Sequence, residues 1–265
     1  MFTGIHHYLK RMLILLSPAK KLDYSNQTVT TNFTIPENLA QSEKLIKALQ
    51  KLSVKKVCAL MDLSEDLGQL NVQRYASWNA DFTQGELKQA ILAFNGEVYQ
   101  GMDANHMSAS YVEFAQNNLR ILSGLHGLLR PLDLIKPYRL EMGTNLSVGA
   151  KKNLYAFWGD SIADRCNAEL KTLGSSTVIN LASAEYFKAV NPKKLQANVI
   201  TPSFKDLKNG QLKSLFLYIK QARGMMAGFA IRNRITNPEE LKAFNGGGYR
   251  FTEALSDETN WVFTR

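Results

Sequence analysis

The chain has 265 residues, of which 45% are apolar, and it carries a formal net charge of +9 at pH 7. This composition supplies a packed core and excludes an intrinsically disordered chain. No apolar run approaches the roughly 18–20 residues that a membrane span requires, which argues against a membrane protein. The length allows one large domain or two tightly packed halves.

The start of the chain divides into two parts. Residues 12–16 form a short apolar run that predicts a buried strand, and Pro18 ends it, because proline lacks an N–H donor and restricts the residue before it. The residues before this strand differ in character and lack the cleavage site of a secretory signal. We therefore interpret residues 1–11 as an extension outside the fold and residues 12–265 as one domain.

The first half of the chain predicts mainly helices. Pro36, Ser53 and Ser64 are typical of helix starts, and leucines follow them at helical spacing. Extended backbone is expected between these helices and after them. The predicted helices are 36–52, 53–61, 64–75, 85–94 and 108–122, and the predicted extended segments are 28–36 and 98–99.

The second half predicts strands and helices in alternation. The dipeptide Asn209-Gly210 is a strong hairpin signal, and Ser183 is a typical helix cap. Since the alternation lacks a regular βαβ period, the fold class expected is α+β, an irregular mixed α/β domain. The predicted strands are 177–181, 198–205, 211–219, 249–251 and 261–263, and the predicted helices are 160–173, one from Ser183, 221–234 and a short one from Pro238.

The cysteines and histidines form no recognisable site. Cys58 and Cys166 are far apart, and neither has a second cysteine or a histidine at ligand spacing, so neither a disulfide framework nor a zinc site is expected. Two free thiols fit a reducing compartment, and we expect a cytoplasmic protein without a cofactor or an obligate metal. Whether either thiol responds to peroxide stays open.

Positive charge is concentrated in one segment. Residues 186–235 contain ten basic residues and one acidic residue, Asp206, so this segment alone carries a charge equal to that of the whole chain. Such a one-sided field attracts polyanions, and phosphate backbones are the obvious target. The alternative is a solvated surface on which the charges scatter once the chain folds.

The segment 123–130 carries the motif that points most specifically to a function. Gly124 and Gly127 bracket Leu125 and His126, and Arg130 follows. Glycines allow the backbone to turn sharply and approach a ligand closely. The pattern resembles the hairpin of helix-hairpin-helix modules, which bind backbone phosphate without reading sequence, although an ordinary turn between helices explains it equally.

Three other motifs are weaker. Ser17 and Lys20 match the S-x-x-K pattern of serine acyl enzymes, but the companion motifs of that class are missing from the chain. Residues 178–188 form a strand-to-helix junction of the kind where nucleotides and small ligands bind, with helix capping by Ser183 as the plain alternative. The glycines of 245–249 lack the lysine and hydroxyl residue of a phosphate-binding loop.

Taken in order, several segments resemble the YaaA family of bacterial peroxide-stress proteins. The likeness covers essentially the whole chain from Met12 to Phe263, and six blocks in the right order are hard to obtain by chance. The blocks are LILLSPAK (13–20), AILAFNGEVYQG (90–101), RILSGLHGLLRPLD with PYRLEMG (120–143), YAFWGD (155–160), VINLAS with EYFK (178–188) and ARGMM (222–226).

This resemblance implies a cytosolic protein that acts during hydrogen peroxide stress and limits oxidative damage linked to free iron. It also implies a single mixed α/β domain of unusual topology, with a basic cleft and a helix-hairpin-helix element that binds double-stranded DNA.

The leading hypothesis is a DNA-binding stress protein without a catalytic centre, whose partner is double-stranded DNA. Basic side chains would contact phosphates and the glycine hairpin would grip the backbone. The residues predicted to bind DNA are Lys20, Lys21, Gly124, Leu125, His126, Gly127, Arg130, Lys188, Lys193, Lys194, Lys213, Lys220, Arg223, Arg232 and Arg234.

The second hypothesis is a repair-type enzyme, a lyase or glycosylase, that acts on a base or nucleotide of damaged DNA. It needs a carboxylate or lysine held in a cleft, and the candidates are Lys20, Glu141, Asp160 and Glu185. A third hypothesis, iron sequestration, is disfavoured because the chain lacks a Glu-x-x-His motif and a Cys/His cluster. The oligomeric state is not predicted.

Overall fold

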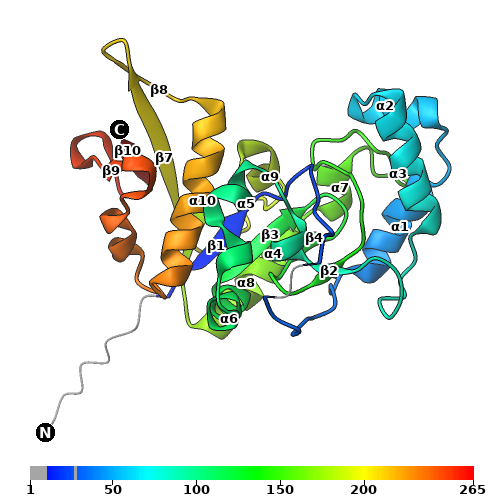
Figure 1. Ribbon diagram of the computed structural model, residues 1–265, viewed down its shortest axis with the longest axis horizontal. Coiled ribbons are helices and arrows are strands. Elements are labelled where there is room, and N and C mark those ends of the chain that lie inside the picture. The colour runs from blue at the N-terminus through cyan, green and yellow to red at the C-terminus, as the bar shows by residue number, and fades with distance from the viewer. Residues whose placement is uncertain (1–10, 27–28) are drawn as a thin grey trace, which may run out of the picture.

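The computed structural model describes residues 11–26 and 29–265 (Figure 1). The predicted extension over residues 1–11 falls, apart from Arg11, outside the described residues. The described chain forms a single mixed α/β domain, as expected, in which one eight-stranded sheet supports helices on its faces and at its ends. Across the described ranges, no helix is both long and apolar enough to cross a membrane.

The centre of the sheet is parallel. Five strands lie in the order β3-β1-β6-β7-β10 and all run in the same direction. Every residue of β1 is buried, as expected for a parallel strand covered on both faces. The bounds of the central strands are β1 Leu13–Leu16, β3 Leu119–Ser123, β6 Thr177–Leu181, β7 Asn198–Lys208 and β10 Asn260–Thr264.

The margins of the sheet are antiparallel. β4 (Gly127–Leu129) pairs with β3, β9 (Arg250–Phe251) pairs with β10, and β8 (Gln211–Lys213) pairs with the end of β7. Separately, β2 (Lys88–Gln89) pairs with β5 (Leu134–Ile135). The sheet is therefore mixed, in agreement with the irregular mixed α/β fold predicted from the sequence.

Two groups of elements stand at the ends of the molecule, and the other helices lie between them along the sheet (Figure 1). α1 to α3 make a lobe at one end of the molecule, while the long helix α10 and the β7–β8 hairpin stand at the other end (Figure 1). Ser53 and Ser64 cap α2 and α3, as predicted. The helix bounds are α1 Leu39–Leu49, α2 Val54–Met61, α3 Glu65–Ser77, α4 Ala90–Ala93, α5 Glu97–Met102, α6 Ala109–Asn118, α7 Leu154–Trp158, α8 Ser161–Leu173, α9 Ala184–Lys188 and α10 Phe216–Arg232, with short 3-10 turns η1 Ala104–His106, η2 Pro238–Ala243, η3 Gly246–Gly248 and η4 Glu253–Leu255.

Helices α5 and α10 touch backbone to backbone. A Cβ atom on Gly224 would lie 1.8 Å from the carbonyl oxygen of Val98, and one on Gly101 would lie 2.3 Å from the carbonyl oxygen of Gln221. Only glycine allows helices to approach this closely, because it has no side chain to hold them apart. This contact fixes the position of α10 relative to the strand-end loops.

The segment predicted as a helical hairpin is a β-hairpin. Residues 119–123 and 127–129 are strands β3 and β4, and Gly124, Leu125 and His126 form the turn between them. A buried apolar run such as that of β3 cannot be told from a helix by periodicity alone, which explains the wrong prediction.

The turn itself is part of the core. Leu125 and His126 are fully buried, and the two glycines are buried as well. A Cβ atom on Gly124 would lie 2.2 Å from the carbonyl oxygen of Leu140, and one on Gly127 would lie 2.8 Å from the Trp158 ring. The glycines of this motif therefore permit close packing inside the protein.

Candidate functional site

A cavity lies at the carboxyl ends of the central parallel strands. Ser17 follows β1 and Ser183 follows β6, and these strands are neighbours in the sheet. Ligand sites of open α/β sheets lie at this edge. The cavity has a volume of about 820 Å³, and its walls also include residues of α5, α10 and the segment 138–141. Its size suits a nucleotide or a comparable small molecule.

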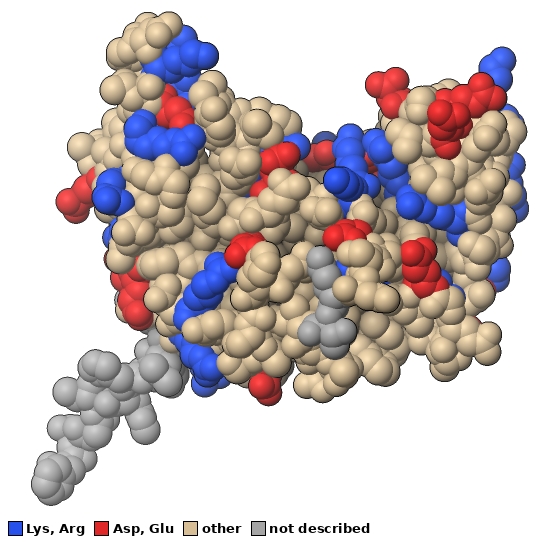
Figure 2. All heavy atoms as spheres, in the orientation of Figure 1, with Lys and Arg blue, Asp and Glu red and all other residues tan. Residues whose placement is uncertain are grey.

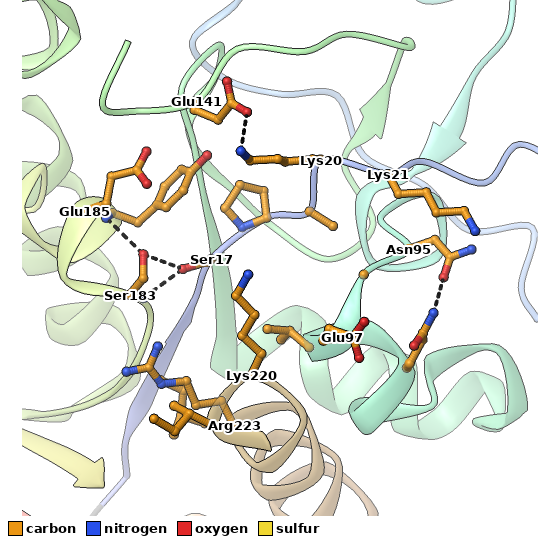
Figure 3. A pocket seen from close by; sticks show the side chains of 18 of the residues that line it. Ser17, Lys20, Lys21, Asn95, Glu97, Glu141, Ser183, Glu185, Lys220 and Arg223 are labelled. Atoms are coloured by element: carbon orange, nitrogen blue, oxygen red, sulfur yellow. Dashed lines mark hydrogen bonds and ion pairs between the residues drawn. The ribbon is translucent and has the colours of Figure 1, made fainter. Parts of the chain in front are cut away.

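The floor of the cavity is tied together by two serines (Figure 3). The backbone N–H of Ser183 donates to Ser17 Oγ at 2.9 Å, and the two Oγ atoms lie 3.4 Å apart. Ser183 also caps α9 by accepting from the Tyr186 N–H, as predicted. Tyr99 Oη donates to the Ser17 carbonyl oxygen at 3.1 Å. Ser17 thus holds a fixed position without a histidine or lysine base beside its Oγ in the described contacts.

Glu141 is shared by two cations. Lys20 Nζ lies 3.1 Å from Glu141 Oε1, and Arg139 Nη2 lies 3.1 Å from the same oxygen. Both Glu141 and Arg139 are largely buried, whereas the Lys20 side chain is mostly exposed at the cavity rim (Figure 3). The carboxylate is therefore neutralised, and the pair of cations leaves one positive charge in excess.

Glu185 lies near the segment that carries Glu141, on the same side of the cavity (Figure 3). Its Oε1 accepts from the Gly143 N–H at 2.8 Å, and its backbone oxygen accepts from Tyr155 Oη at 3.0 Å. Burial raises the pKa of Tyr155, and the nearby Glu185 carboxylate raises it further. Lys188 Nζ lies 4.8 Å from the centre of the Tyr155 ring, and neither of these two residues lines the cavity.

Two cations enter the cavity from α10. Arg223 Nε is buried without a hydrogen-bond partner among the described residues, and burial lowers the pKa of its guanidinium. Lys220 lies one turn earlier, with its Nζ 4.3 Å from the centre of the Phe216 ring. Within the part of the chain that the structure describes, neither cation lies within 4 Å of a carboxylate oxygen. Figure 3 shows both side chains extending from α10 toward the serines.

The predicted site residues divide into two groups. Lys20, Lys21, Glu141, Glu185, Lys220 and Arg223 all line the cavity, although they are spread over 204 positions of sequence. The four residues of the glycine hairpin are buried in the core, and Arg130 lies outside the cavity. Arg130 donates to Asp133 Oδ1 at 2.9 Å and pairs with Glu37.

Other predicted residues lie away from the cavity. Asp160 accepts from Asn191 Nδ2 at 2.6 Å and pairs with Lys194 at 3.7 Å, outside the cavity wall. Lys193 is exposed in the same loop, and Lys213 is exposed on β8, at the tip of the β7–β8 hairpin.

The two arginines at the end of α10 are also remote. Arg232 is about 18 Å from Lys220 along the helix, at 1.5 Å per residue. It donates to the carbonyl oxygens of Met102 and Asp103, which end α5. Arg234 lies over the Tyr111 ring at 5.9 Å. These contacts give both arginines structural partners.

Sequence reasoning missed several cavity residues. Arg139 and Tyr138 belong to a quoted block, but nothing in their spacing marked them as cavity residues. Phe216 was placed in a strand, although it begins α10. Its neighbours Lys213 and Lys220 were the available signal, because basic and aromatic residues in alternation are typical of nucleic-acid surfaces. In the described ranges, no group of three or more His, Cys, Asp or Glu side chains is arranged to hold a metal ion.

Comparison with known proteins identifies the family. Residues 12–255 match the family model described as peroxide stress protein YaaA. The chain belongs to the YaaA family. A UPF0246 protein of Aliivibrio fischeri (strain MJ11) is 52% identical over 254 residues, which cover 96% of this chain and 98% of the relative. UPF0246 proteins of Cupriavidus metallidurans and of Neisseria meningitidis serogroup B are 52% and 50% identical, each over 96% of this chain and 98% of their own length.

Membership confirms the resemblance deduced from the sequence blocks. It links the chain to the oxidative stress response, in line with the name of the family model. The matched region begins at Met12, where the first strand of the fold was predicted to start.

Proposed function

We propose that this YaaA-family protein binds double-stranded DNA in the cytoplasm, largely independent of sequence, and thereby limits iron-linked oxidative damage during peroxide stress. The observation that carries the proposal is a set of cations without carboxylate partners in the described structure. Lys21, Lys220 and Arg223 of this set line the cavity, and the exposed Lys188 and Lys213 lie outside it.

The arrangement of these cations supports a backbone contact. Lys213 lies on β8, and Lys220 and Arg223 follow on successive parts of α10, so they form a row from the tip of the β7–β8 hairpin into the cavity. Figure 2 shows a broad hollow between this hairpin and the lobe of α1–α3, with Lys and Arg side chains on both sides of it. A row of exposed cations beside a hollow suits a phosphate backbone.

Ion pairs within the protein make some of the predicted DNA-binding residues less available to phosphate. Arg130, Lys194 and Arg232 each lie within 4 Å of a carboxylate oxygen, so a phosphate would have to compete for them. The half-buried Lys205 and the exposed Lys208 on β7 add charge to the same hairpin as Lys213. We therefore assign the main backbone contacts to the hairpin and α10.

The test is a salt series. Binding of a fluorescent duplex of arbitrary sequence is measured by anisotropy between 50 and 300 mM salt, and log Kd is plotted against log salt. Each phosphate contact contributes a slope of about 0.9 on B-DNA. Removing Lys208, Lys213 and Lys220 together should lower the slope by about 2.7. Replacing Lys151, Lys152 and Lys171 together by alanine, three exposed lysines elsewhere, is the matched control.

The outcomes are distinct. Equal binding of unrelated duplexes, a steep salt slope and a loss confined to the triple variant would support the proposal. A flat salt dependence, or an equal loss in the control variant, would refute it.

A second function, an enzyme acting on a base or nucleotide of damaged DNA, is favoured by one observation. The cavity brings Glu141, Glu185 and Lys20 together at a strand edge, whereas Asp160 lies outside it. Incubation with oligonucleotides that carry oxidised or abasic sites, analysed on denaturing gels, tests this activity. Product formed by the wild type and lost in Glu185→Gln would support the enzyme, and unchanged substrate with every lesion would argue against it.

A further inference from the structure

An exposed aromatic side chain stands at the mouth of the cavity. Phe216, the first residue of α10, lines the cavity, yet 74% of its surface is exposed. The Lys220 ammonium lies over its ring at 4.3 Å. Exposure of a large aromatic ring costs free energy in water, and an aromatic ring flanked by lysines is typical of surfaces on which nucleobases stack.

A cation lies deeper in the same cavity. Arg223 is one turn beyond Lys220 on α10, and its Nε is buried without a partner among the described residues. A buried N–H without a hydrogen-bond acceptor is costly, and an anionic oxygen entering the cavity would accept from this Nε and relieve that cost. The carboxylates on the cavity wall are occupied elsewhere, since Glu141 binds Lys20 and Arg139, Glu185 accepts from Gly143, and Glu97 accepts from Gln221.

The remaining wall of the cavity is apolar and aromatic. Tyr138, Tyr186, Leu181 and Ile219 line it between the mouth and the strand ends. Such a wall can pack against the flat, apolar face of a base, and the polar groups on the edge of the base then hydrogen-bond elsewhere. The cavity therefore combines a stacking surface, an apolar wall and a cation without a counter-ion among the described residues.

We infer that this cavity accepts one unpaired nucleotide of the bound DNA, with its base against Phe216 and the apolar wall and its phosphate at Arg223 and Lys220. This inference rests on the proposed DNA binding and adds a preference for strands in which a base has left the stack. A fully paired duplex keeps its bases stacked inside, so its nucleotides cannot enter a cavity of about 820 Å³.

The experiment compares two DNAs of the same sequence and length, one fully paired and one with a single unpaired 2-aminopurine in a bulge. Anisotropy gives the affinity for each, and 2-aminopurine fluorescence reports stacking of the unpaired base. The wild type should bind the bulged DNA about five- to tenfold more tightly, which corresponds to one base–aromatic stack, and its fluorescence should be quenched on binding.

Two variants separate the cavity from the rest of the surface. Phe216→Ala alters an exposed side chain and should leave the fold intact, while Arg223→Gln removes the partly buried charge but keeps most of the side-chain volume. Each should lower the preference for the bulge to less than about twofold, since one base–aromatic contact or one phosphate contact is lost. Lys171→Gln, an exposed change on α8 outside the cavity, should keep the full preference.

The readouts distinguish the two proposals. Equal affinity of the wild type for both DNAs, or a preference that Phe216→Ala retains, would overturn the inference while leaving duplex binding in place. Failure of the wild type to bind either DNA would overturn the proposed function itself, and the inference with it.

Discussion

The contact between α5 and α10 predicts that Gly224→Ala destabilises the protein. The new Cβ atom would lie 1.8 Å from the Val98 carbonyl oxygen and 2.9 Å from the Met102 backbone nitrogen. Because Cβ atoms essentially never approach other atoms closer than 3.0 Å, the two helices must separate by at least 1.2 Å. Overpacking of this kind costs about 3 kcal/mol, from which the better helix propensity of alanine subtracts about 1 kcal/mol.

The expected net loss is thus about 2 kcal/mol in the free energy of unfolding, or roughly 4–8 °C in Tm for a chain of this size. Urea unfolding followed by fluorescence of the buried tryptophans Trp158 and Trp261 measures it. Gly228→Ala is the control, because it lies one turn along the same helix face and its Cβ atom would overlap much less, at 2.7 Å from the flexible end of Arg232 and 2.8 Å from the Met102 carbonyl oxygen. A Gly224→Ala variant as stable as the wild type, or less affected than Gly228→Ala, would refute the reasoning.

Three further predictions concern buried titratable groups. Glu169→Gln should lower the free energy of unfolding by about 3–5 kcal/mol in urea titrations, since it leaves the buried Arg120 guanidinium, now 2.6 Å from Glu169 Oε2, without its counter-ion. Burial lowers the pKa of His126 to about 3, so its imidazole stays neutral in the folded protein down to about that pH. In the unfolded chain the exposed imidazole binds a proton below its ordinary pKa of 6.5. The contribution of neutral His126 to the free energy of unfolding is complete above pH 6.5 and is lost as the pH falls toward 3, at up to about 1.4 kcal/mol per pH unit. The difference in unfolding free energy between wild type and His126→Asn should therefore shrink as the pH falls over that range. A difference that stays constant with pH would contradict the assignment. Burial raises the pKa of Cys166 to about 12, so native protein at pH 8 should be alkylated by iodoacetamide at Cys58 and not at Cys166, as peptide mass mapping would reveal.

Elements with strong local signals were predictable from the sequence. The strands β1 and β6, the helix α8 and the hairpin between β7 and β8 lie within a few residues of their predicted bounds. A proline follows β1, a serine cap follows β6, Asp160 and Gly174 flank α8, and the Asn209-Gly210 turn follows β7. These residues act through their own backbone geometry. Such signals are independent of the rest of the fold.

Elements that depend on distant contacts were not predictable. The segment 98–99 was expected to be extended, but it lies in α5, whose close packing on α10 requires glycines 123 residues apart. Likewise, residues 85–94 divide into β2 and α4 because β2 pairs with β5, and 211–219 divide into β8 and the start of α10. Contacts between distant segments determine the secondary structure of each of these segments, and the local periodicity of the sequence carries no information about such contacts.

The candidate site was predictable in part for the same reason. The cavity residues come from five separate segments, and sequence reasoning selected Lys20, Glu141, Glu185, Lys220 and Arg223 by chemistry alone. Sequence reasoning also predicted that the glycine motif contacts a ligand. In the structure these glycines allow the buried β-hairpin to pack closely against the protein's own chain. A glycine that permits close approach of a ligand and one that permits close approach of the protein's own backbone look identical in a sequence.

The close packing of α5 also determines how much the cavity must rearrange when a ligand binds. On one side its Gly101 meets α10. On the other side, a Cβ atom on Gly96 would lie 2.9 Å from Ala19, and Asn95 donates its N–H to the Lys21 carbonyl oxygen at 2.9 Å. The loop after β1 and the helix that carries Arg223 are therefore held at a constant separation by backbone contacts. A ligand entering between them finds walls that are already ordered, so it loses little affinity to the entropy of assembling its own binding site.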